Sequence, residues 1–180
     1  MNIKQVTTAH KVAEFTYNTG RGKAPLALNW FVDKSIQKDT SGRVYLLVVD
    51  GIIKKIGGSA DKGGIKGTMN AYAGGAAKTK GRPSQTRHSI CLLIKQALDY
   101  GSQVDVYLIP SQRVRADVTG LFDTSPGLVA PFKEMEDKCV ADYVRVEGAH
   151  PEWNFKEAGN AFSAELQALH VAHLEEALAM

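Results

Sequence analysis

The chain has 180 residues, which is enough for one hydrophobic core without stabilising cross-links, and a single core is the default expectation. Its net charge of +3 does not by itself select a class of partner. Cys91 and Cys139 fit neither a CxxC pair nor a disulfide framework, so we expect reduced thiols. The chain start lacks a signal-peptide apolar region, and no apolar run approaches the roughly 18 residues of a membrane span. We expect a soluble, cytoplasmic protein with no membrane partner.

The first 42 residues show the least regular pattern. An apolar patch from Leu26 to Val32 follows the basic turn TGRGKAP at 19–25. We expect residues 1–42 to be an N-terminal extension packed on the core.

Residues 43–56 predict a β-hairpin, because two β-branched runs flank an Asp-Gly turn at 50–51. A two-residue turn would place Tyr45 opposite Ile56, with Tyr45 and Lys55 on opposite faces of the sheet. A three-residue turn with a glycine bulge would instead place Tyr45 directly opposite Lys55. In that second register the ammonium favours the phenolate, and Tyr45 becomes a usable general base. Tyrosine in a strand and lysine at a strand end are also ordinary.

Residues 57–81 hold eight of the 17 glycines and predict a long, functional loop. The run is no P-loop, because Gly64 stands where the lysine should be. Between Lys54 and Lys95, nine basic residues face only one acid, Asp61, so this segment carries +8 and the rest of the chain −5. Such a field suits a nucleic acid backbone, although a basic run is often a solvated face.

Three helices and one further strand are predicted beyond this loop. A helix capped by Ser84 or Thr86 ends at Gly101, a strand runs over 103–109, and a loop leads to a helix from Pro131 to about residue 146. A last helix covers about 156–180. The order predicts a small α/β (α+β) domain with a short, mostly antiparallel sheet.

Glu136 lies in the middle of the apolar arc of the helix from Pro131, between Phe132 and Val140. A carboxylate on an inward face needs a cation, a metal or a hydrogen-bond network. Both a structural ion pair and a functional carboxylate fit this position.

The last helix has a broad apolar arc, which indicates burial between two layers or a dimer surface. The arc consists of Phe162, Leu166, Leu169, Val171, Leu174 and Leu178.

The order of these motifs resembles the GIY-YIG nuclease family, and its type II restriction endonucleases in particular. The matching pieces are VY at 44–45, KIG at 55–57, the basic Gly-rich segment, and a helix, a strand and a helix carrying a glutamate. The likeness runs from about residue 43 to 154, so 43–155 is expected to be the GIY-YIG-like core. It implies a divalent-metal-dependent double-strand DNA endonuclease with sequence specificity.

The resemblance also implies roles for individual residues. Tyr45 would be the general base, Lys55 would lower its pKa, and Glu136 would bind one Mg²⁺. Asn154 matches the terminal asparagine of many family members.

One departure concerns the family arginine, which follows the YIG glycine by eight or nine residues. Here Ile65 and Lys66 occupy those positions, and lysine lacks the guanidinium fork. Lys66 could substitute, or Arg82 or Arg87 could reach the site. Further DNA contacts are expected from Lys62, Lys78, Lys80 and Tyr72.

The predicted function is that of a restriction-type endonuclease acting as a homodimer, because a palindromic site is matched by a two-fold protein. A DNA-binding protein with weak or no catalysis is the alternative, given the missing arginine. A phosphate-ligand enzyme that uses the Gly-rich loop is a third reading. The recognition sequence depends on side chains of an unplaced loop.

Overall fold

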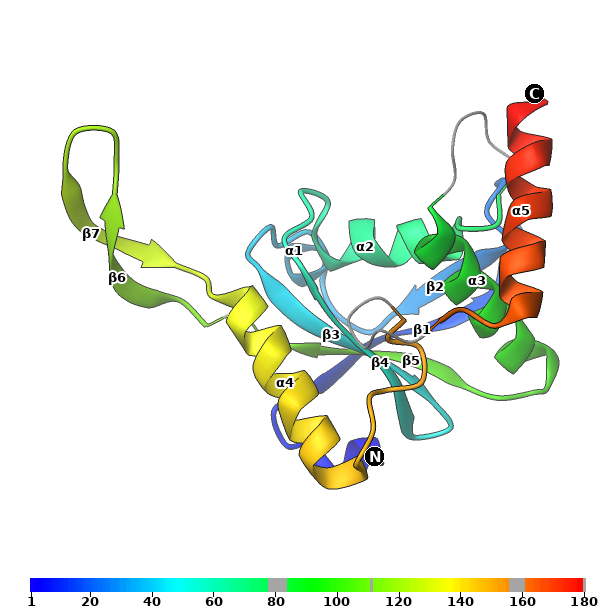
Figure 1. Cartoon of the computed structure of the whole chain (residues 1–180), viewed down its shortest axis with the longest axis horizontal. Coiled ribbons are helices and arrows are strands. Elements are labelled where there is room, and N and C mark those ends of the chain that lie inside the picture. Colours follow the sequence, from blue (N-terminus) through cyan, green and yellow to red (C-terminus); the bar gives the residue numbers. More distant parts are fainter. Residues whose placement is uncertain (78–83, 111, 156–160, 180) are drawn as a thin grey trace.

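One five-stranded sheet forms the centre of the computed structural model, with helices on both faces (Figure 1). The structure describes residues 1–77, 84–110, 112–155 and 161–179. The strand order is β2-β1-β5-β3-β4, and all neighbouring pairs are antiparallel. This confirms the predicted fold class.

The elements have the following bounds. The strands are β1 (His10–Tyr17), β2 (Leu26–Trp30), β3 (Arg43–Val49), β4 (Ile52–Ser59), β5 (Val104–Ile109), β6 (Val114–Thr119) and β7 (Thr124–Val129). The helices are η1 (Ile3–Gln5), α1 (Lys34–Gln37), α2 (Gly64–Ala73), α3 (Gln85–Asp99), α4 (Phe132–Glu147) and α5 (Ala164–Leu178).

Two hydrophobic clusters cover the two faces of the sheet. The larger one joins Tyr45 and Leu47 of β3 to residues of α2 and α3. The smaller one joins Leu46 and Val48 of β3 to Tyr143 of α4. The alternation along β3 follows from the two-residue period of a strand, and it puts α4 on the face opposite α2 and α3.

The N-terminal segment contributes directly to this sheet. β1 pairs with β5 and β2 pairs with β1, so the segment expected as an extension shares one sheet with the β3–β4 hairpin. Burial of Val12, Phe15 and Leu26 in the larger cluster explains why these strands are integral to the core.

The hairpin follows neither predicted register. Val49 pairs with Ile52 across a two-residue turn, with positive φ at Asp50 and Gly51, so the turn itself is that of the first alternative and contains no bulge. However, the register shifts within β4, where Val48 pairs with Ile53 but Leu47 pairs with Lys55. This bulge brings Lys55 onto the face of Leu47, which is also the face of Tyr45.

The glycine-rich segment is not one long loop, because residues 64–73 form α2. Ile65, Met69, Tyr72 and Ala73 lie on one helical face and are buried, and this face outweighs the low helix propensity of the glycines. Gly64 permits the close approach of α1, since a Cβ there would lie 2.7 Å from Lys38 Cα and its φ is +73°.

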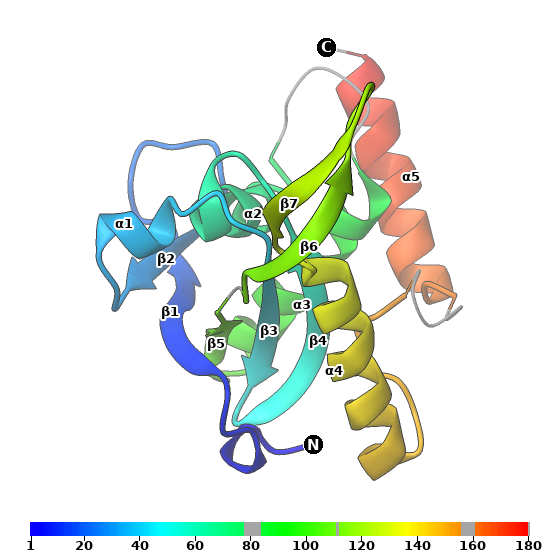
Figure 2. The same ribbon diagram turned by 90° about the vertical axis from the view of Figure 1, so that its left-hand side faces the viewer.

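The expected loop before Pro131 is also wrong, because it contains the antiparallel pair β6–β7. We call residues 114–129 the arm. It projects from the domain beside the start of α4 (Figure 2). Pro126 and Gly127 are unusual inside a strand but lie in β7, where no third strand is paired among the described residues.

The C-terminal helix α5 packs one side against α3, and its first buried contacts come from Phe162 and Leu166. Leu169, Val171 and Leu178 are exposed, so α5 is not buried between two layers. The start expected at residue 156 lies outside the described residues.

Both cysteines are free, Cys91 buried and Cys139 half-buried. In the described part of the chain, no helix has the length and apolar character needed to cross a membrane.

Candidate active site

A polar cavity of about 310 Å³ lies where β3, β4, α2 and α3 meet. Tyr45, Tyr72 and Arg87 line it together with Ser59 and Thr68. The Tyr45 and Tyr72 hydroxyls are 2.7 Å apart, and so are the Ser59 and Thr68 hydroxyls. Residues from four elements thus present hydroxyl groups and one guanidinium to the same space, and Asp61, just before α2, adds a carboxylate.

Tyr45 is placed in the cavity by the strand that carries it. Its side chain is 3% exposed and packs against α2 and α3, with the Tyr72 ring centroid 6.1 Å from its own. A buried phenol needs a hydrogen-bond partner, and Tyr72 supplies one. Lys55 is 2% exposed and lies on the same face of the hairpin, opposite Leu47.

Two adjacent glycines of β4 connect this cavity with α4. A Cβ on Gly57 would lie 2.5 Å from Tyr45 Cζ, and a Cβ on Gly58 would lie 2.5 Å from Glu136 Oε2. Any side chain at either position would therefore displace one of these groups. Gly58 also lines the cavity, so the phenol and the carboxylate approach the same short stretch of backbone from its two faces.

Glu136 is buried on the sheet-facing side of α4, as its helical position predicts. Its Oε2 accepts a hydrogen bond from Lys133 Nζ at 3.1 Å, and Lys133 also pairs with Asp137. These bonds to Asp137 and Glu136 raise the pKa of Lys133. The sequence interpretation missed Lys133, although its spacing of three residues from Glu136 is a signal for such a pair.

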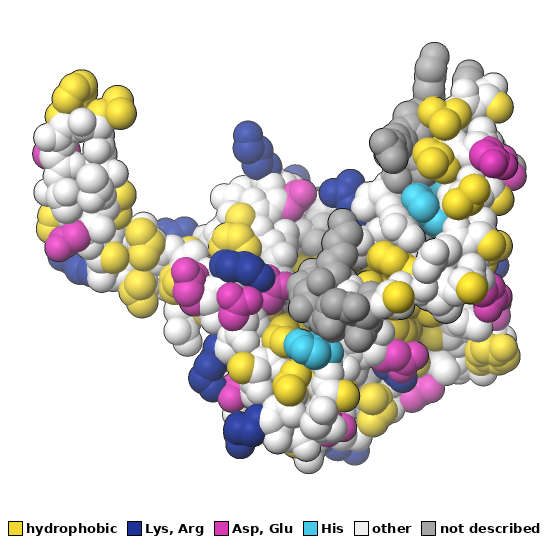
Figure 3. Space-filling view, viewed as in Figure 1, with side chains coloured by type: hydrophobic (Ala, Val, Ile, Leu, Met, Phe, Trp, Pro, Cys, Tyr) yellow, Lys and Arg dark blue, Asp and Glu magenta, His cyan; other side chains and the backbone are white. Residues whose placement is uncertain are grey.

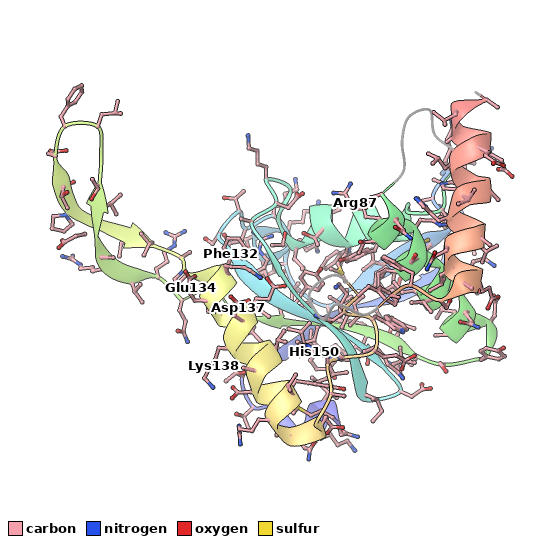
Figure 4. The ribbon with its side chains drawn as sticks, viewed as in Figure 1. Arg87, Phe132, Glu134, Asp137, Lys138 and His150 are labelled. Carbon is pink, nitrogen blue, oxygen red and sulfur yellow. The ribbon has the colours of Figure 1, made fainter. Side chains whose placement is uncertain are left out.

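A groove of about 470 Å³ opens beside Glu136, with Lys133, Asp137 and His150 along it. Figure 4 shows Phe132 at the start of α4, with Asp137 and Lys138 further along the helix, and Arg87 at the start of α3. The Phe132 ring covers Gly42 and Gly58, since Cβ atoms there would lie 2.7 Å from its Cγ and 3.1 Å from its Cδ2. This contact holds the start of α4 against β4.

The predicted DNA-binding residues are distributed unevenly. Arg87 is exposed and lines the cavity. Lys66 is half-buried on α2, but the α2 residues along the cavity are Thr68, Ala71 and Tyr72. Lys62 is exposed just before α2. Lys78, Lys80 and Arg82 lie outside the described residues.

Asn154 is fully buried and bonds to both polar groups of Ile56. Its Oδ1 accepts from the Ile56 N–H at 2.9 Å, and its Nδ2 donates to the Ile56 carbonyl at 2.8 Å. Trp153 N donates to Lys54 O at 2.8 Å. Together these bonds cover β4, the edge strand of the sheet, just before the two glycines.

The carboxylate of Glu136 fits a magnesium site that uses one protein ligand. Among the described residues, no three His, Cys, Asp or Glu side chains gather into a metal-binding group. Mg²⁺ usually keeps several waters and binds one or two carboxylates plus substrate phosphates. A nearly buried carboxylate at the end of a groove, beside a hydroxyl-lined cavity, is consistent with that mode.

Most of the chain resembles two solved nuclease structures. No protein-family model matches it, and no curated protein sequence does. Restriction endonuclease HPY188I in complex with product DNA aligns with a TM-score of 0.50 and 21% identity, over 84% of each chain. A mutant of bacteriophage T4 EndoII aligns with a TM-score of 0.54 and 14% identity, over 86% of this chain and 98% of that one. At such identities the likeness establishes a common fold.

Proposed function

We propose that this protein is a divalent-metal-dependent, double-strand DNA endonuclease of the GIY-YIG and restriction type. The observation that carries the proposal is the meeting of the Tyr45 phenol and the Glu136 carboxylate at Gly57 and Gly58. The two fold neighbours are described as a restriction endonuclease bound to product DNA and as EndoII, and this supports a nuclease.

Tyr45 is the general base in this proposal. It would accept a proton from the attacking water, while Tyr72 holds its hydroxyl in position through the 2.7 Å hydrogen bond. Lys55 lies on the same face of the hairpin, and a nearby ammonium favours the phenolate form of a tyrosine.

Glu136 would hold one Mg²⁺, and Lys133 would then release its bond to the carboxylate. When bound, the metal supplies positive charge to the phosphate and to the departing 3′ oxygen. The buried position of Glu136 restricts its rotamers, which keeps the carboxylate beside Gly58.

Arg87 is the better candidate for the arginine that the family carries, because it lines the cavity with Tyr45. Its guanidinium can grip two phosphate oxygens, which the ammonium of Lys66 cannot. We assign Lys62, Lys66, Lys78, Lys80 and Arg82 to the DNA backbone, where charge matters more than geometry. Cutting a palindrome would require two copies, so a homodimer is part of the proposal.

The test is digestion of plasmid DNA with and without Mg²⁺, using the wild type and Glu136→Gln. We expect discrete, metal-dependent fragments from the wild type. Glu136→Gln should cut at least about 100-fold more slowly while still retarding DNA on a gel, because the amide cannot replace the charged ligand. Near-normal cleavage by Glu136→Gln contradicts the mechanism.

The alternative is a DNA-binding protein without effective catalysis. It is favoured by the ion pair that already occupies Glu136 and by Lys66 in place of an arginine. Wild-type protein that retards plasmid but leaves it intact at every Mg²⁺ concentration supports this alternative. The pair Tyr45→Phe and Tyr72→Phe adds a check on the enzyme. Tyr45→Phe removes the base and should abolish cleavage, whereas Tyr72→Phe removes only the hydrogen bond that positions the base and should slow cleavage less.

A further inference from the structure

The arm carries an apolar tip that contacts nothing in the described domain. Leu121 is 93% exposed and Phe122 is 98% exposed, and Figure 3 shows hydrophobic side chains at the end of the arm. The tip is ordered by a bond from Gly120 N to Asp123 O at 2.7 Å and by the Thr119 and Thr124 hydroxyls, 3.1 Å apart. An ordered, fully exposed aromatic residue is typical of a binding site.

A largely apolar cavity, which could accept the apolar side chains of the tip, lies near the base of the arm. It measures about 800 Å³ and lies between β1, α1 and the ends of β3 and β5. Its apolar wall includes Val12, Val32, Ile36 and Leu108. This volume is ample for an aromatic and an aliphatic side chain together.

Two arginines in the cavity lining could bind a carboxylate side chain. Arg43 is only 3% exposed; two of its nitrogens donate to the Ser41 carbonyl, but its Nη1 has no hydrogen-bond partner among the described residues. Arg113 also lines the cavity and donates to Ser41 Oγ at 2.7 Å. Asp39 is the acid within the same lining, and bonds from Ser41 lower its pKa. The two arginines carry two positive charges against the one negative charge of Asp39, so an incoming carboxylate would be stabilised.

The tip offers that carboxylate, because Asp123 follows Phe122 directly. Within the arm, Arg115 is outweighed by Asp117 and Asp123, so residues 114–129 carry a net charge of −1. The acid Asp123 at the tip would be repelled by the phosphates of DNA. The charge pattern therefore favours a protein partner.

The tip cannot reach the cavity of its own chain. Strands β6 and β7 have six residues each, which separates the tip from Arg113 by roughly 20 Å at about 3.4 Å per residue. The arm also leads away from α1, whose residues line the cavity, in both ribbon views (Figures 1 and 2). A second copy of the chain can supply a cavity for the tip of the first copy and a tip for its cavity.

We propose that two copies exchange arms, so that Leu121 and Phe122 of each chain fill the apolar cavity of the other and Asp123 pairs with Arg113 and Arg43 there. Reciprocal exchange about a two-fold axis closes the assembly at two chains. This inference rests on the proposed homodimer but not on the proposed catalysis, and it assigns the interface to the arm instead of α5.

The first test is sedimentation equilibrium of the full chain and two matched variants. We expect a wild-type dimer, a weakening of self-association by about tenfold or more in Phe122→Ser, and no change in Leu128→Ser. Leu128 is a fitting control because it is 65% exposed on the same arm but lies in β7. Both side chains are exposed, so thermal unfolding should show that both variants fold.

The second test exchanges the charges. Asp123→Arg and Arg113→Glu should each weaken the dimer, and the double variant should recover most of the loss, since the pair is restored in reverse. Absence of this recovery overturns the charge pairing.

Other outcomes separate the alternatives. A wild-type monomer overturns both the exchange and the homodimer, whereas a Phe122→Ser dimer as tight as wild type overturns only the exchange. Weaker DNA binding by Phe122→Ser with an unchanged dimer overturns the exchange and makes the tip a DNA contact. Plasmid cleavage is measured separately, so failure of the nuclease proposal remains distinguishable.

Discussion

Gly57 and Gly58 show how two single residues define the candidate site. Each lacks the side chain that would collide with Tyr45 on one face of β4 or with Glu136 on the other. The inward position of Glu136 follows from the helical period alone, because an arc between Phe132 and Val140 must face the sheet. The common face of Tyr45 and Lys55 was predicted for a bulged turn and arises instead from a bulge inside β4.

We predict that Gly58→Ala reduces cleavage by about 10- to 100-fold while the protein stays folded. The new Cβ would push the Glu136 carboxylate aside, and displacements near 1 Å at a catalytic group have effects of this size. Cleavage rates and thermal unfolding measure the two expectations. Gly120→Ala is the control, because its Cβ would meet its nearest atom at 3.5 Å. Unchanged cleavage by Gly58→Ala would contradict a role for the Glu136 carboxylate in the reaction.

At the scale of elements, the edge strand β4 depends on a segment that is distant in the sequence. Asn154 reaches both polar groups of Ile56 and imitates a neighbouring strand where the sheet ends. The pattern HPEWN contains no strand signal, so this role was not predicted from the sequence. The arm and α2 were missed for a related reason, since glycine and proline obscured their periodicity.

We predict that Asn154→Ala lowers the free energy of unfolding by about 2–4 kcal/mol. Both Ile56 groups would be left in a buried site without these bonds, and each costs roughly 1–2 kcal/mol. Urea unfolding measures the loss.

The control for this change is Glu152→Ala in the same segment. The partner of Glu152 is Lys54, and the Glu152 side chain is 64% exposed. We therefore expect Glu152→Ala to lower the free energy of unfolding by less than about 1 kcal/mol. Equal losses in the two variants would contradict a special role for the Asn154 bonds.

For the whole molecule, three histidines join the C-terminal helix to the domain. His88 of α3 is buried and stacks on His173 of α5, with ring centroids 4.4 Å apart, and His170 lies 5.4 Å away. His170 and His173 are three residues apart in the sequence, and the packing of α5 on α3 brings His88 to them. Burial first, and then the two neighbouring imidazoles, lower the pKa of His88 from 6.5 to about 4.

We predict that acid destabilises the protein through His88. Because its folded-state pKa lies below the ordinary value, the unfolded chain binds the proton more tightly. The stabilising effect is complete above about pH 6.5 and is lost as the pH falls towards 4. Between pH 7 and 5 this amounts to about 2 kcal/mol.

Urea unfolding at the two pH values measures the effect. His88→Phe keeps an aromatic ring for His173 to stack on but cannot titrate. Between pH 7 and 5 its free energy of unfolding should therefore fall by about 2 kcal/mol less than that of the wild type. His10→Phe changes an exposed histidine and should behave like the wild type. An equal pH dependence in His88→Phe and wild type would contradict this assignment.

The fold class, the hairpin, the α3–β5–α4 order and the inward face of Glu136 could be predicted from the amino-acid sequence, because these depend on periodicity and turn chemistry within short segments. The register of Lys55, the place of β1 and β2 in the sheet, the position of Arg87 at the cavity of Tyr45 and the projecting arm appeared only in the folded chain. Those features depend on which surfaces meet across the chain, and burial and hydrogen bonding between distant segments outweigh local propensity there.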